Sequence, residues 1–341
     1  MMRRLTVLTM VLAAVAGCDA SKETDTSKPS RFGFQTDIPT SLIEEGKVAY
    51  ARYCVGCHGV NGDGAGEASK FLNPKPRNFA LGNFKFSSTR SGQLPTDADL
   101  KHVLRVGLRG SAMPNFNLLP ERTVDGLIAY IKTFSPKWAE RGPGAPVPIV
   151  DDPWRTSEDK SEAIARGEAV YHGYSTCWSC HPAYVPEAKI NEHLVAFGRP
   201  VREGFRPGLN HSEGKPNSEG ELIYPPDFKR DFVRAGVTVN DLYRSIAAGI
   251  TGTAMPTWVD SIDVPGKNPG DPPMVSKTDL WAMAYYVQHL IVQRPALLAQ
   301  GQFEVRNRPR PIYLNGPPPG ATAAPETPAE PATTQPADFG F

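Results

Sequence analysis

The sequence predicts an all-α protein made of two related helical units in tandem, and three observations support this. The pentapeptide Cys-x-x-Cys-His occurs twice, at residues 54–58 and 177–181. The tripeptide Ala-Met-Pro also occurs twice, at residues 112–114 and 254–256. Apolar residues with helical spacing stand before and after these motifs in both copies. At 341 residues the chain is long enough for about two domains of ordinary size.

Each unit begins with a predicted helix that leads into its Cys-x-x-Cys-His motif. The segment GKVAYARYC at residues 46–54 corresponds to GEAVYHGYSTC at residues 167–177. A glycine and a tyrosine occupy matching places, namely Gly46 with Gly167 and Tyr50 with Tyr171. We therefore expect the same helix in both units.

A second predicted helix stands ahead of each Met-Pro pair. At an offset of 142 residues, Thr96 corresponds to Thr238 and Asp99 to Asp241. The pattern Thr-x-x-Asp resembles a capping box, which satisfies free amide groups at a helix N-terminus. The apolar residues that follow recur at four-residue steps, and each helix ends near a glycine that can take the left-handed conformation.

A third helix closes each unit. Residues 123–134 and 279–290 carry matching apolar stripes with helical spacing at an offset of 156 residues. We accordingly expect the first unit at residues 41–138 and the second at residues 159–300. Residues 139–158 are rich in proline and glycine and predict an extended linker between the units.

The N-terminal segment has the layout of an export signal. Residues 1–17 contain two arginines, then an apolar stretch too short to span a bilayer, then small residues ahead of Cys18. The sequence VAGC resembles the lipobox of bacterial lipoproteins, which implies a lipid on Cys18 and a location on the periplasmic face of a membrane. An ordinary secretory signal that leaves Cys18 free is the alternative. Residues 18–40 are then a polar tether.

Composition limits the partners. The 37 basic and 36 acidic residues nearly cancel, and no basic run with interleaved aromatic residues occurs, so we expect no nucleic-acid partner. Residues 301–341, crowded with Pro, Ala and Thr, predict a disordered tail.

Every cysteine other than Cys18 belongs to one of the two pentapeptides. In an exported protein a Cys-x-x-Cys pair can form a disulfide, a redox dithiol or half of a zinc site. A histidine directly after the second cysteine, in both copies, indicates covalent attachment of haem c. We expect two haems bound through thioethers, with the neighbouring histidines as iron ligands. The residues are Cys54, Cys57 and His58 for the first haem, and Cys177, Cys180 and His181 for the second.

The methionine that is repeated in both units is suited to bind each iron on the side opposite the histidine. A thioether sulfur closes the sixth position and raises the reduction potential. Met113 follows His58 by 55 residues and Met255 follows His181 by 74, so either methionine can lie on a loop folded back over its haem. Methionine more often fills gaps in a core, but core packing poorly explains two copies in one tripeptide frame. The other histidines are expected to be structural: His102, His172, His193, His211 and His289.

The order of helix, Cys-x-x-Cys-His, helix, Met-Pro and closing helix resembles class I, mitochondrial-type cytochromes c. The resemblance covers most of residues 41–138 and 160–295 and implies two tandem cytochrome c-like domains. It implies that the first and last helices of each domain cross, near Gly46 and Tyr130 in one and near Gly167 and Tyr286 in the other.

The resemblance also implies that a proline carbonyl accepts the Nδ1 hydrogen of each haem histidine. Pro74 or Pro76 is the acceptor expected in the first unit. In the second unit PPDF at residues 225–228 echoes PRNF at residues 76–79, but lies 26 residues further from its histidine, so the acceptor there stays open. The polar residues 201–221 are expected to form an extra surface loop.

The function that these features predict is electron transfer without enzymatic activity. Two haems closed by His and Met pass single electrons between redox proteins of a bacterial respiratory chain, such as an oxidase, a quinol-oxidising complex or a periplasmic dehydrogenase. One alternative is an electron-transfer subunit fixed within a larger oxidoreductase complex. Another is a dihaem peroxidase, which needs one open iron and is disfavoured by two equivalent Met-Pro frames.

Overall fold

The computed structural model describes residues 38–266 and 268–294. The predictions made for residues 1–17, for Cys18, for residues 18–37 of the tether and for the tail at residues 301–341 lie outside the described residues. Within the described ranges the fold is dominated by helices, which confirms the helical prediction. The exception is a two-stranded antiparallel hairpin of β1 (Lys215–Pro216) and β2 (Leu222–Ile223), which the sequence did not predict.

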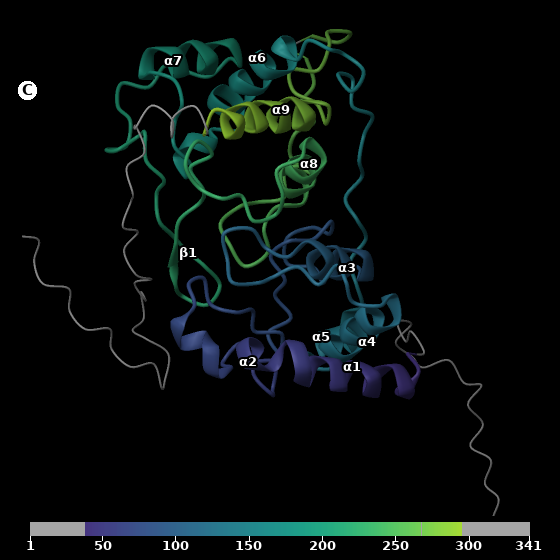
Figure 1. Cartoon of the computed structure of the whole chain (residues 1–341). Coiled ribbons are helices and arrows are strands. Elements are labelled where there is room, and N and C mark those ends of the chain that lie inside the picture. The colour runs from purple at the N-terminus through teal and green to yellow at the C-terminus, as the bar shows by residue number, and fades with distance from the viewer. Residues whose placement is uncertain (1–37, 267, 295–341) are drawn as a thin grey trace, which may run out of the picture.

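The helices form two groups that lie one above the other in Figure 1. We call residues 38–138 the first half and residues 159–294 the second half. The first half contains α1 (Thr40–Tyr53), α2 (Val55–His58), the 3₁₀ helix η1 (Glu67–Phe71), α3 (Asp97–Val106), α4 (Glu121–Lys132) and the start of α5 (Lys137–Arg141). The second half contains α6 (Ser161–Ala169), η2 (Val170–Tyr174), the 3₁₀ helix η3 (Cys177–Ser179), α7 (Glu187–Ala196), α8 (Val239–Ala248) and α9 (Asp279–Val292).

The buried apolar side chains also form two separate clusters, one in each half. In the first, Tyr50 from α1 packs with Leu127 from α4 and Leu104 from α3. In the second, Tyr171 and Tyr243 are almost fully buried with residues of α9. The apolar stripes that the sequence shows on these helices therefore face the two cores.

The expected crossing of the first and last helices is confirmed in both halves. Helices α1 and α4 approach so closely at Gly46 that a Cβ atom there would lie 1.8 Å from the carbonyl oxygen of Gly126. Helices α6 and α9 repeat this at Gly167, where a Cβ atom would lie 2.1 Å from the carbonyl oxygen of Ala282. Because any side chain would collide with backbone, glycine is what permits both crossings.

The predicted caps of the middle helices are confirmed as well. Helix α3 begins at a capping box in which the Thr96 hydroxyl accepts from the Asp99 amide at 3.1 Å. Helix α8 begins with the same bond, from the Asp241 amide to the Thr238 hydroxyl at 3.1 Å. These bonds satisfy amide groups that have no partner inside the helix.

The second half departs from the first where its opening helix meets the pentapeptide. Two more residues separate the glycine of the crossing from the first cysteine in the second half than in the first. Helix α6 absorbs them by passing into the π-helical turn η2. Thr176 then adopts a left-handed conformation, with φ of 48°, directly before Cys177. The helix expected to lead into the second pentapeptide is therefore confirmed as far as Tyr174, but it changes from α to π at Val170 and ends before Cys177.

The sequence predicts an extended segment at residues 139–158, but residues 139–141 belong to α5. Residues 142–158 contain no helix, and they are docked on both halves. The Gly144 amide donates to the carbonyl of Leu94 at 2.9 Å in the first half. The Trp281 indole donates to the carbonyl of Val150 at 2.9 Å in the second half. Hydrogen bonds at both ends hold this segment in one path between the two cores.

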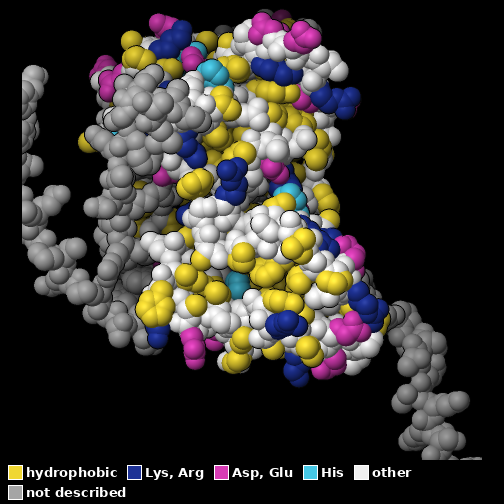
Figure 2. All heavy atoms as spheres, viewed as in Figure 1, with side chains coloured by type: hydrophobic (Ala, Val, Ile, Leu, Met, Phe, Trp, Pro, Cys, Tyr) yellow, Lys and Arg dark blue, Asp and Glu magenta, His cyan; other side chains and the backbone are white. Residues whose placement is uncertain are grey.

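The surface carries charges of both signs. In Figure 2, basic and acidic side chains are interspersed over the visible face, in keeping with the nearly balanced composition. None of the helices in the described ranges combines the length and apolar character needed to cross a membrane.

Candidate haem centres

Each pentapeptide histidine is fixed by a backbone carbonyl that arrives from a distant loop. His58 Nδ1 lies 3.0 Å from the carbonyl oxygen of Arg77, and His181 Nδ1 lies 3.0 Å from that of Pro226. A carbonyl oxygen can only accept, so Nδ1 carries the hydrogen in both rings. The lone pair is then on Nε2, the nitrogen that is free to bind a metal.

These acceptors correct one expectation and settle an open one. The first acceptor is Arg77 and not Pro74 or Pro76, because any residue offers a carbonyl and the loop presents that of Arg77. The second acceptor, Pro226, stands 149 residues after Arg77 in the echoed segment PPDF. The longer chain before PPDF therefore does not change the register in which it meets His181.

A phenylalanine two residues after each acceptor stacks on the histidine. The rings of His58 and Phe79 have centroids 4.5 Å apart and lie 15° from parallel. The rings of His181 and Phe228 have centroids 4.8 Å apart and lie 17° from parallel. Sequence reasoning did not identify these two residues, although the shared phenylalanine of PRNF and PPDF was the available signal.

Burial keeps both imidazoles neutral. Each of His58 and His181 is 8% exposed. Burial lowers the pKa of His58, and it lowers the pKa of His181 to about 4. Neutral imidazole is the form that binds iron, so the protonation state suits the predicted role.

The four pentapeptide cysteines are free thiols. Burial raises the pKa of Cys54 to about 12 and that of Cys177 to about 12, which keeps both sulfur atoms protonated. Neither Cys-x-x-Cys pair is closed by a disulfide, so all four sulfur atoms remain available for thioether bonds.

A tyrosine from the first helix of each half anchors the residue after the histidine. The Tyr50 hydroxyl donates to the carbonyl of Gly59 at 2.8 Å, and the Tyr171 hydroxyl donates to the carbonyl of Pro182 at 2.9 Å. The tyrosines matched in the sequence thus make the same contact in space.

The two methionine loops share one hydrogen-bond pattern. In the first, the Met113 amide donates to the Ser111 hydroxyl at 3.2 Å, and that hydroxyl donates to the carbonyl of Leu108 at 2.7 Å. In the second, the Met255 amide donates to the Thr253 hydroxyl at 3.1 Å, and that hydroxyl donates to the carbonyl of Ile250 at 2.8 Å. Both methionines are half-buried, and the structure thus presents them on equivalent loops.

A glycine starts each methionine loop. Gly107 ends α3 with φ of 68° and Gly249 ends α8 with φ of 75°, in the left-handed region that other residues avoid. The chain leaves both helices at this point and turns back, which is the course expected from the sequence.

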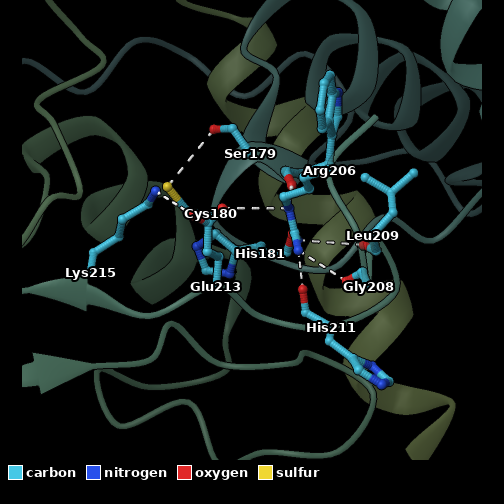
Figure 3. Close-up of polar contacts among 10 residues, drawn as sticks. Ser179, Cys180, His181, Arg206, Gly208, Leu209, His211, Glu213 and Lys215 are labelled. Atoms are coloured by element: carbon cyan, nitrogen blue, oxygen red, sulfur yellow. Dashed lines mark hydrogen bonds and ion pairs between the residues drawn. The ribbon is translucent and has the colours of Figure 1, made fainter. Parts of the chain in front are cut away.

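The segment at residues 201–221 lies on the surface, as expected, but it is tied to the second site. It folds back over the second pentapeptide, where the Glu213 amide donates to the carbonyl of Cys180 at 2.8 Å. Arg206 donates through Nε to the carbonyl of Trp178 at 3.1 Å and through Nη2 to that of His181 at 3.0 Å (Figure 3). Sequence reasoning missed Arg206, because nothing local marks an arginine 25 residues away as a partner of His181.

Several buried polar groups lack partners among the described residues, and their chemistry suits haem. Ser135 Oγ and Trp138 Nε1 are orphaned in the first half, and Arg234 Nε in the second. Lys85 stands 149 residues before Arg234, makes no hydrogen bond within the described ranges, and has its pKa lowered by burial to about 8. Haem brings two carboxylates, for which such donors and cations are fitting partners.

Two of the remaining histidines are structural, as expected. His172 is fully buried, and its two ring nitrogens bond the carbonyl of Glu168 at 2.9 Å and the amide of Tyr184 at 3.3 Å. His193 Nε2 lies 3.3 Å from the Glu168 carboxylate. Both ring nitrogens of His172 are therefore occupied by protein partners.

Comparisons with known proteins cover both halves of the chain. The cytochrome c family matches residues 43–135. A chain of the reducing HAO-like protein complex of Kuenenia stuttgartiensis is similar in structure, with a TM-score of 0.56 and 29% sequence identity. The similarity covers 74% of this chain and 99% of that chain, so it extends over parts of both halves. Among curated proteins there is no match.

The second comparison corrects one expectation from the sequence. The chain was expected to have no enzymatic role, yet the similar chain is part of a complex like hydroxylamine oxidoreductase, which is an enzyme family. A haem iron with all positions filled bears only on whether that iron can bind a substrate. A chain can still take part in an enzymatic reaction as a subunit of a larger complex. Residues 43–135 form a domain of the cytochrome c family, which implies covalently bound haem c and haem-based electron transfer.

Proposed function

We propose that the chain is a dihaem electron-transfer subunit that works within a larger oxidoreductase complex. The observation that carries this proposal is the repetition of one site in both halves. In each, a buried histidine beside two free cysteines donates from Nδ1 to a carbonyl, and the phenylalanine two residues after that carbonyl's residue stacks on the histidine ring. The family match covers the first site, and the repetition extends the interpretation to the second.

When bound, haem c supplies a one-electron couple at its iron. The chain's part is to hold that group through the cysteine sulfur atoms and through Nε2 of His58 or His181. The carbonyls of Arg77 and Pro226 fix the orientation of the imidazoles, and the stacked phenylalanines keep water from them. Lys85, and Arg234 with no hydrogen-bond partner for its Nε among the described residues, are cations that suit its carboxylates.

Met113 and Met255 are the proposed sixth ligands. Support comes from the two equivalent loops, whose hydroxyl bonds hold the methionine amides in place. A centre with all six positions filled changes little in structure on gain or loss of an electron, which suits a relay. Such ligation suits both centres for electron transfer.

The proposal of a larger complex rests on the similarity to a chain of such a complex. That chain is covered over 99% of its length, so the likeness concerns a whole subunit. The partners expected from the sequence, a respiratory oxidase, a quinol-oxidising complex or a periplasmic dehydrogenase, are all redox enzymes that exchange electrons singly.

We also propose that the chain is exported and lipid-anchored at Cys18, which lies outside the described residues. The support is the leader sequence ending in VAGC. Mass spectrometry of the N-terminal peptide tests this. A diacylated cysteine at position 18 is expected, and an unmodified Cys18 or an intact leader would contradict the anchor.

A matched pair of variants tests the dihaem proposal. Cys54→Ser with Cys57→Ser, and Cys177→Ser with Cys180→Ser, remove one attachment site each. Optical redox titration is expected to show two one-electron steps in the unaltered chain and one different step in each variant. A chain whose titration is unchanged by the second pair of substitutions would leave only one haem and end the proposal.

The place in a complex is tested by purification in mild detergent from the native membrane. The chain is expected to elute with a redox enzyme whose substrate reduces or oxidises both haems. Elution of the chain alone, with haems that no co-purified enzyme can reduce or oxidise, would return it to the class of free carriers.

A further inference from the structure

The carbonyl oxygens of the two attachment turns are satisfied by different donors. In the first half the Gly59 amide donates to the carbonyl of Val55, and the Gly64 amide donates to that of His58, both at 2.9 Å. Both donors are backbone amides from the segment that directly follows the histidine. The first attachment turn is therefore closed by neutral groups.

In the second half Pro182 stands where the first half has Gly59. Proline has no N–H, so the carbonyl of Trp178 has no amide donor at that place. Arg206 supplies one, with Nε 3.1 Å from the carbonyl oxygen of Trp178 and Nη2 3.0 Å from that of His181. One guanidinium in the second half (Figure 3) thus takes the place of the two glycine amides in the first half.

Arg206 is itself held firmly by its own loop. Nη1 donates to the carbonyl of Gly208 at 2.9 Å, and Nη2 also donates to that of His211 at 2.6 Å. The side chain is 18% exposed. Because hydrogen bonds to the loop and to the attachment turn hold the planar guanidinium, its positive charge stays beside that turn.

The nearby acidic group does not cancel this charge. Glu213 Oε2 lies 3.7 Å from Arg206 Nε, but Glu213 also pairs with Lys215 at 3.0 Å. Two cations share one carboxylate, so one positive charge is left beside the second attachment turn. In the first half the same positions are held by uncharged amides, so the two centres differ in their electrostatics.

We propose that Arg206 is a positioning residue that closes the second attachment turn and raises the reduction potential of the second haem. The inference rests on the proposed function, since it presupposes a haem on Cys177 and Cys180. A nearby positive charge favours the reduced iron, because reduction lowers the positive charge on the metal. Low exposure limits the screening of this effect by salt.

Four variants of the full chain, produced in a host that attaches haem c, separate the two roles. Arg206→Gln removes the charge, and Arg206→Lys keeps it. Pro182→Gly combined with Arg206→Gln restores a backbone donor for Trp178 without restoring the charge. Glu213→Gln removes only the opposing charge, and its backbone bond to Cys180 is unaffected. The readouts are the haem count by intact mass and the potentials of both haems.

Arg206→Gln is expected to lower the ratio of reduced to oxidised second haem, at a fixed applied potential, by roughly three- to tenfold. Glu213→Gln is expected to raise that ratio, and Arg206→Lys to leave it near that of the unaltered chain. The double variant should keep the lowered ratio while regaining thermal stability lost in Arg206→Gln. The first haem should not change in any of the four.

If the reduction potential of the second haem is unchanged in both Arg206→Gln and Glu213→Gln, this inference is overturned while the proposed function stands. Equal shifts of both haems would do the same, because Arg206 contacts only the second attachment turn. An unaltered chain that carries a single haem would overturn the proposed function first and this inference with it. If Arg206→Gln loses the second haem, Glu213→Gln still decides the electrostatic part.

Discussion

Arg90 and Asp260 form a two-point ion pair between the halves, with Nε 2.7 Å from Oδ2 and Nη2 2.9 Å from Oδ1. Next to Arg90, the Ser91 amide donates to the carbonyl of Ala248 at 2.9 Å, and the Gly92 amide donates to the Thr251 hydroxyl at 3.1 Å. The turn at residues 90–92 therefore braces the chain on both sides of Met255. One half of the molecule supports the methionine loop of the other.

This brace predicts the effect of Thr251→Val. Valine keeps the shape but leaves the Gly92 amide without an acceptor, since Thr251 Oγ1 is its partner in the structure. The loss expected is about 1 to 3 kcal/mol of unfolding free energy, measured by urea denaturation. Thr251→Ser, which keeps the oxygen, is the control. Equal stability of the two variants would show that the contact contributes nothing.

The crossing of α1 and α4 predicts that Gly46→Ala is severely destabilising. The new Cβ would lie 1.8 Å from the carbonyl oxygen of Gly126, so the helices must separate. We expect a loss of about 3 kcal/mol or more, seen as a lower urea midpoint of the first half. Gly56→Ala is a matched control, because its Cβ would meet no atom within 4 Å. A crossing that tolerates Gly46→Ala as well as the control would contradict the packing described.

The methionine loops predict an effect of Ser111→Ala on ligand exchange. Without the hydroxyl, the Met113 amide loses its acceptor and the carbonyl of Leu108 loses one of its two donors. We expect exogenous imidazole to displace Met113 at roughly fivefold lower concentration, from about 1 kcal/mol of lost support. Spectral titration of the first haem measures this, with Ser111→Thr as the conservative control. Displacement at the same imidazole concentration in all three proteins would show that the Ser111 hydroxyl does not support ligation by Met113.

His172 predicts a loss of stability on mild acidification. Burial lowers its folded-state pKa from 6.5 to about 4. Between these two values the unfolded chain binds the proton and the folded chain does not, so stability falls as the pH drops from about 6.5 to about 4. The contribution of this group over that window is ~3 kcal/mol.

The control for this prediction is His172→Gln, whose amide can still donate to one neighbour and accept from the other. Unfolding free energies at several pH values are expected to fall less steeply in this variant than in the unaltered chain. Parallel curves for the two proteins would mean that His172 does not cause the acid sensitivity.

The repeats in the sequence predict much of this architecture, because helix caps and helix ends are determined mainly by neighbouring residues in the chain. The Thr96 and Thr238 caps and the glycines that end α3 and α8 depend on residues close in sequence. The crossings at Gly46 and Gly167 join helices far apart in the chain, and the resemblance to cytochromes c implies them. The echo of PRNF in PPDF marks the two segments that carry the histidine acceptors, but not the acceptors themselves, because the sequence favours Pro74 or Pro76 where the structure has Arg77, and it leaves Pro226 open.

What the sequence did not predict depends on contacts between distant residues. Arg206 replaces an amide that Pro182 lacks, and only the folded loop brings the two together. The π-helical turn η2 resolves a two-residue difference in length, which composition alone does not locate. Proline and glycine at residues 139–158 predict extension, but not the hydrogen bonds that dock this segment on both cores.

The most direct test of the account is to map covalent haem on peptides of the purified full-length chain by mass spectrometry. We expect one haem on the peptide with Cys54 and Cys57 and one on the peptide with Cys177 and Cys180. A second peptide with free thiols, or with a disulfide in place of haem, would contradict the claim that both halves carry a redox centre.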